Sequence, residues 1–319
     1  MKLLNNLRWK PFWTSYIGCI MGCLEYLGIN ISSEWVFGGS GYAFIINIHE
    51  TVCPSGPTAW IREPVNILGR NLGYELIGVH SNKYASDYYE KKKVAWNMIR
   101  NAIDNNYPCF GWEIDIPPEY YVIYGYDEIG YYYSGPNCIY GKGPKPWREI
   151  ADMDTGVLEV YVLKPKNIED KVKIIRDAFK FAIEFSNSPN KWTYPKYATG
   201  PNGYDLWINA LKKGIASDIG VSYNAAVWSE CRSYAVKFLE KAKESIDIEL
   251  EELFNEAIKY YNITANSLKE LTKIFPFPLE KGATRDESKC EKAINYLMEA
   301  KEAEINGLKI LSEILMKLK

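Results

Sequence analysis

Histidine is almost absent from this chain of 319 residues, which contains only His49 and His80. Imidazole is the side chain on which much acid–base catalysis and metal binding depend. This scarcity argues against a site built from several histidines. The seven cysteines include no Cys-x-x-Cys pair, so the sequence suggests neither a disulfide framework nor a zinc ribbon. We expect reduced, mostly buried thiols, no metal site and no cofactor.

A surplus of positive charge is also missing, because 38 Lys and Arg are balanced by 40 Asp and Glu. Proteins that neutralise nucleic-acid phosphates need such a surplus, so we expect no nucleic-acid partner. No apolar run is long enough to cross a bilayer. The start of the chain lacks an apolar stretch followed by a small-residue cleavage site. These absences predict a soluble, cytoplasmic protein that does not bind membranes.

The periodicity of apolar residues predicts an α+β fold in two domains, residues 1–165 and 166–319. In the first domain, an apolar helix at 14–27, stopped by Gly28, precedes a polar helix at about 86–105. Turn residues separate the strands that follow, which indicates an antiparallel meander. The strands expected in the meander are 109–115, 121–126, 131–133 and 157–163, and two further short strands, 43–48 and 76–79, are expected before the polar helix.

Beyond Pro165 the strand pattern ends, and helical periodicity predicts an all-α second domain. Residues 186–203 are rich in Pro and Gly and form a linker or a long ordered loop. Glu230 and Arg232 on one helix suggest a tie between the domains. An apolar stripe on the last helix favours burial within the domain or a homodimer through residues 292–318. The expected helices are 168–185, 204–213, 223–242, 250–261 and 292–318.

An apolar helix that begins at Ser15 is followed by a meander that contains Tyr121-Val-Ile-Tyr-Gly-Tyr-Asp127. This order of elements resembles papain-like cysteine peptidases of the bacteriocin-leader type. The helix ends in Tyr26-Leu-Gly28, and Phe37-Gly-Gly-Ser-Gly41-Tyr-Ala-Phe44 follows it. These two segments resemble the group that includes the N-terminal domain of butirosin biosynthesis protein H. The resemblance covers roughly residues 10–165. It implies a central buried helix packed on an antiparallel sheet, with an acyl-transfer or peptidase site at the start of that helix.

In such sites a Cys at the helix N-terminus is paired with a His that an Asp or Asn orients. Counting along the resembling segments places Ser15 at the nucleophile position, Glu119 at the His position and Gly135 at the acid position. The resemblance therefore implies that the usual catalytic residues have been replaced. Cys19 and Cys23 lie further into the helix, where we expect buried thiols rather than a Cys-His site or a metal site.

Two interpretations of the replaced positions remain open. Glu119 can act as a base for the Ser15 hydroxyl if the two side chains meet. Alternatively, Ser15 caps the helix and Glu119 is a solvated turn residue. The tyrosines and tryptophans of the meander, together with Cys19, either line a ligand cleft or fill the core. The residues that we expect to contact a ligand are Trp112, Tyr121, Tyr133, Trp147 and Cys19.

The sequence thus favours a catalytically degenerate papain-like protein that binds a peptide or a small acylated molecule in a Tyr- and Trp-lined cleft. A second hypothesis is an acyltransferase or amide hydrolase that uses Ser15 with Glu119 as base. A third assigns the function to the helical domain, as an oligomerisation or partner module.

Overall fold

The computed structural model describes residues 1–153, 155–188, 190–246 and 248–318. The chain forms two compact units, each built from two separate stretches. Unit 1 contains residues 1–32 and 73–168, and unit 2 contains residues 33–72 and 169–319. The division near residue 168 lies close to the expected boundary. Residues 33–72, which we expected in the first domain, belong instead to unit 2.

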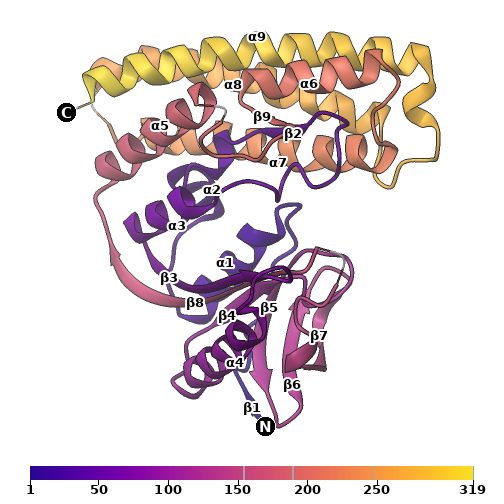
Figure 1. The fold of residues 1–319 in the computed structure, drawn as a ribbon. Helices are drawn as coiled ribbons and strands as arrows, with labels where there is room; N and C mark the ends of the chain where they lie inside the picture. The colour runs from indigo at the N-terminus through magenta and orange to yellow at the C-terminus, as the bar shows by residue number, and fades with distance from the viewer. Residues whose placement is uncertain (154, 189, 247, 319) are drawn as a thin grey trace. The chain divides into compact units, whose positions relative to one another are not determined.

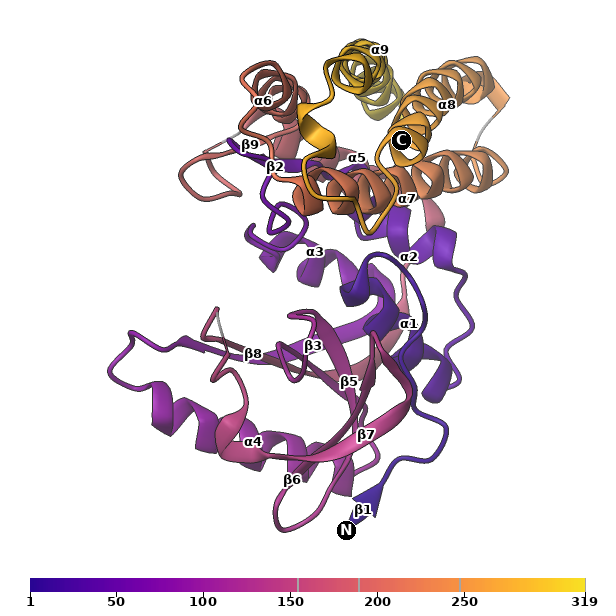
Figure 2. The ribbon, with the colours of Figure 1, turned by 90° about the vertical axis from the view of Figure 1, so that its right-hand side faces the viewer.

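Unit 1 is an antiparallel meander with helices on its two faces, in agreement with the predicted α+β class. The strand order is β3-β8-β4-β5-β6-β7, and the short strand β1 also pairs with β5. Helices α1 and α4 lie on opposite faces of this sheet (Figures 1 and 2). The helices are α1 Ser15–Tyr26 and α4 Tyr88–Asp104, and the strands are β1 Lys2–Leu3, β3 Leu72–Asn82, β4 Cys109–Trp112, β5 Tyr120–Tyr126, β6 Gly130–Gly135, β7 Cys138–Pro146 and β8 Val157–Ile168.

Strand β7 was not predicted, because its Gly, Lys and Pro residues are typical of a turn. It lies at the end of the strand order, where an edge position tolerates such residues. Helix α1 follows the prediction closely and ends where Gly28 takes a φ of +70°. That left-handed conformation suits a glycine that closes a helix.

Unit 2 is mainly helical, but the predicted all-α architecture was wrong. Strands β2 Asn47–His49 and β9 Tyr197–Thr199 pair in a small antiparallel sheet. β9 lies inside the expected loop 186–203, so its backbone groups find partners only when a distant segment pairs with it. The helices are α2 Ser33–Gly39, α3 Glu63–Leu68, α5 Lys171–Asn187, α6 Pro201–Lys212, α7 Asp218–Lys243, α8 Glu251–Ile274 and α9 Glu287–Lys317.

The long C-terminal helix α9 packs along α8 and also contacts α6 and α5 (Figure 1). Its apolar stripe is therefore covered within unit 2. The sequence pattern placed Ile305 in this stripe together with Leu297 and Leu311, but Ile305 is exposed, and small residues such as Ala300 and Gly307 are buried instead. Within the described ranges, no helix combines the length and the apolar character needed to cross a bilayer.

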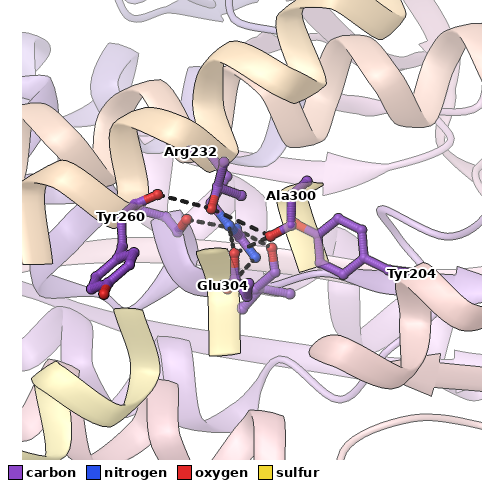
Figure 3. A network of polar contacts seen from close by, with 8 residues as sticks. Tyr204, Arg232, Tyr260, Ala300 and Glu304 are labelled. Carbon is purple, nitrogen blue, oxygen red and sulfur yellow. Dashed lines mark hydrogen bonds and ion pairs between the residues drawn. The ribbon is translucent and has the colours of Figure 1, made fainter. Parts of the chain in front are cut away.

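A buried ion pair lies inside unit 2 (Figure 3). Arg232 of α7 donates through Nε to Glu304 of α9 at 2.7 Å and through a terminal nitrogen to the second carboxylate oxygen at 2.9 Å. Its other terminal nitrogen donates to the carbonyls of Ala43 and Ile45, both at 2.8 Å. Both charged side chains are fully buried. The expected tie between domains is thus a contact inside unit 2, and Glu304 is the partner of Arg232.

We expect Arg232→Met to lower the free energy of unfolding of unit 2 by about 3–5 kcal/mol, because it leaves the Glu304 carboxylate buried without its cation. Urea denaturation followed by circular dichroism measures the change. Lys241→Met is the matched control on the same helix, since the pair of Lys241 with Glu244 is exposed and is worth at most about 1 kcal/mol. Equal denaturation midpoints for the two variants would contradict the expectation.

Candidate active site

Helix α1 is held close to the chain segment that precedes it. A Cβ atom on Gly18 or Gly22 would overlap a carbonyl oxygen of residues 8–10, so only glycine permits this approach. Trp9 is buried and donates through its indole N–H to the carbonyl of Ser15 at 3.1 Å. These contacts fix the position of the first residue of α1.

The side chain of Ser15 connects the start of α1 to the start of β5. Its hydroxyl donates a hydrogen bond to the Glu119 carboxylate and accepts the N–H of Tyr120 at 3.1 Å. Ser15 is 4 % exposed and Glu119 is half-buried, so the pair lies at the edge of the interior. The structure therefore brings together the two residues that the resemblance placed at the nucleophile and base positions.

The loop between β4 and β5 presents Glu119 to Ser15. Its two ends are joined by the Glu113 N–H, which donates to the Glu119 carbonyl at 2.8 Å. The Tyr121 hydroxyl donates to the Pro117 carbonyl at 2.7 Å. Both bonds hold the loop backbone, so the carboxylate position is set by the hairpin as well as by Ser15.

This geometry suits a proton transfer. The serine proton already points at a carboxylate within hydrogen-bond reach, which is the first requirement for general-base catalysis. Ser15 also lies at the positive end of the α1 dipole, where developing negative charge is stabilised.

The third position of the resemblance offers no orienting acid. Gly135 lies at the end of β6, and a Cβ atom there would overlap the ring of Tyr121. A carboxylate side chain would therefore need the aromatic ring to move.

The thiols of α1 lie deeper than Ser15. Cys19 and Cys23 are fully buried. Burial, then the neighbouring Cys23 and Glu119, raise the pKa of the Cys19 thiol well above its usual range. Burial and Cys109 act on Cys23 in the same direction. Since the thiolate is the nucleophilic form, neither cysteine suits catalysis, and Cys19 offers a ligand no accessible surface.

Three of the residues that we expected to contact a ligand are packed in the interior of unit 1. Trp112 donates its indole N–H to Thr155 at 3.1 Å, and Tyr133 donates its hydroxyl to Asp115 at 2.7 Å. Tyr121 meets the ring of Tyr133 edge-on, with 5.8 Å between the centroids. All three are buried, so they act as core residues that would have to move to meet a ligand.

Trp147 lies on the opposite face of the sheet from α1. It is half-buried and stacks on Trp96 of α4, with the ring centroids 5.8 Å apart. Ser15 and Trp147 therefore do not share a site.

A second carboxylate beneath the Ser15 pair escaped the sequence reasoning. Glu159 of β8 is buried and accepts hydrogen bonds from the hydroxyls of Tyr120, at 2.7 Å, and Tyr161. The ring of Tyr16, the second residue of α1, packs edge-on against Tyr120 with 5.0 Å between centroids. A single charge inside the apolar strand 157–163 was the signal that could have identified this residue.

No group of three or more His, Cys, Asp or Glu side chains in the described part of the chain is arranged to hold a metal ion. No family model and no curated protein matches the chain. The functional argument therefore depends on the geometry around Ser15.

We expect alkylation of the folded protein at pH 8 to modify the half-buried Cys53 and Cys138 first and to leave Cys19 and Cys23 unmodified, because burial protects the two α1 thiols and raises their pKa values. Peptide mass spectrometry after timed exposure to iodoacetamide measures the order. The guanidinium-unfolded protein is the control and should react at all seven thiols. Modification of Cys19 as fast as Cys53 would overturn this assignment.

Proposed function

We propose that this chain is a papain-like acyltransferase or amide hydrolase in which Ser15 is the nucleophile and Glu119 the general base. The supporting observation is the hydrogen bond from the Ser15 hydroxyl to the Glu119 carboxylate at the start of a buried helix. The pair joins residues that are 104 positions apart in the chain. An activated nucleophile needs such a base within reach of its proton.

The proposed reaction proceeds in two steps. Ser15 Oγ attacks the carbonyl carbon of an acyl donor, and Glu119 takes the hydroxyl proton. Collapse of the tetrahedral intermediate expels the amine, thiol or alcohol, which takes the proton from Glu119 and leaves an ester on Ser15. In the second step Glu119 removes a proton from water or an acceptor amine, which attacks this ester. Expulsion of Ser15 Oγ, which regains the proton, restores the pair.

The backbone around Ser15 supports the same reaction. The negative charge of the tetrahedral intermediate would develop beside the first turn of α1, where the helix dipole is positive. The Tyr120 N–H holds Ser15 Oγ from the sheet side, which limits the hydroxyl to orientations that keep its proton on Glu119.

The second candidate is a degenerate papain-like protein that binds a peptide or small acylated molecule without turning it over. Its specific support is the low exposure of Ser15, combined with a hydroxyl that both donates to Glu119 and accepts from Tyr120. These bonds serve equally well as a structural connection between α1 and β5. The absence of an acid side chain at Gly135 points the same way.

Ser15→Ala should abolish turnover of surrogate esters and thioesters, because the acyl group would have no nucleophile. Glu119→Gln keeps the shape of the side chain but removes the base, so we expect turnover to fall by about 10²–10⁴-fold. Initial rates and covalent labelling of Ser15 by a fluorophosphonate probe measure both changes.

Ser81→Ala provides the matched control. The Ser81 hydroxyl also donates to a carboxylate in unit 1, that of Asp87, at 3.2 Å, but this pair is exposed. Its removal should leave turnover and labelling unaltered. Unlabelled Ser15, or equal turnover in the wild type and Ser15→Ala, would reject the enzyme and favour the binding protein.

A further inference from the structure

Two apolar segments end beside the Ser15–Glu119 pair. Pro11, Phe12 and Trp13 precede Ser15 by a few residues, and Ile116, Pro117 and Pro118 precede Glu119 directly. The Ser15–Glu119 hydrogen bond brings the ends of the two segments together. We call these six residues the apolar rim.

Four of the six residues of the apolar rim are exposed, and Phe12 and Pro117 are half-buried. Trp13 is 43 % exposed and Ile116 is 70 % exposed, and Pro11 and Pro118 are exposed as well. Single exposed apolar residues are common on any protein. Two apolar segments that meet at one serine and one carboxylate form a local concentration, which is typical of a binding surface.

The backbone of the rim is held in place. The Tyr121 hydroxyl fixes the carbonyl of Pro117 at 2.7 Å, and the Trp9 indole fixes the carbonyl of Ser15. Asp115, next to Ile116, is engaged by Tyr133 at 2.7 Å and Lys142 at 2.6 Å. The Asp115 carboxylate beside the rim is thus already paired with Lys142.

We infer that the apolar rim binds the hydrocarbon part of the acyl group that Ser15 attacks, so that donors with an aliphatic acyl chain are preferred over acetyl donors. This inference rests on the proposed function for the reaction at Ser15. The binding of an acyl chain to the apolar rim does not depend on that reaction. Each methylene buried against the rim should raise kcat/KM by up to about fourfold. A polar acyl group would gain nothing from these side chains.

The test compares p-nitrophenyl acetate, butyrate and octanoate as substrates of the full chain. We expect kcat/KM to rise with chain length. Ile116→Ser and Trp13→Ser should each reduce the octanoate-to-acetate ratio by at least about fourfold. Ile129→Ser is the matched control, because Ile129 is also an exposed isoleucine in a hairpin turn of unit 1, at 58 % exposure, and it should leave the ratio unchanged.

A binding measurement separates this inference from the proposed function. Calorimetry with the Ser15→Ala protein should show tighter binding of octanoyl amide than of acetyl amide, and Ile116→Ser should remove the difference. Equal affinities, or a chain-length ratio that Ile116→Ser does not alter, would overturn the rim assignment even if Ser15→Ala abolishes turnover. Turnover that survives in Ser15→Ala, combined with chain-length-dependent binding, would overturn only the catalytic role.

Discussion

The fully buried guanidinium of Arg232 determines how unit 2 is assembled from separate parts of the chain. Its ion pair with Glu304 joins α7 to α9. It also donates hydrogen bonds to the backbone carbonyls of Ala43 and Ile45. A buried charge is costly unless hydrogen bonds compensate for its lost hydration, and the acceptors around Arg232 come from two other segments, α9 and residues 43–45. Four donated hydrogen bonds therefore hold three segments together.

This constraint explains why residues 33–72 belong to unit 2. Their helix α2 lies against α7, where Phe37 stacks on Tyr234 with ring centroids 4.1 Å apart. Gly38 leaves room for the ring of Phe238. The resembling segment at residues 37–44 thus serves as a packing element of unit 2, whereas the other two resembling segments lie in unit 1. A boundary drawn from composition alone could not separate them.

Unit 1 is organised around the contact between α1 and the meander. Aromatic rings fill the space behind Ser15, and Glu159 is tolerated there because two tyrosine hydroxyls satisfy it. The tyrosines that we expected in a cleft are therefore needed for the core. What remains at the surface near Ser15 is the apolar rim and the half-buried carboxylate of Glu119.

The secondary structure of α1 and of most of the meander follows from the sequence alone, because the patterns of apolar and turn residues that specify it are local. From the sequence, a contact between Ser15 and Glu119 was only one of two open interpretations, and the fold brought the Ser15 hydroxyl to the Glu119 carboxylate. Three features became evident from the three-dimensional fold alone: β9 pairs with β2, Arg232 pairs with Glu304, and the expected ligand-binding tyrosines are buried. Each of these depends on which distant segments come into contact, and a buried polar group or an aromatic ring looks the same in the sequence whether it faces a core or a cleft.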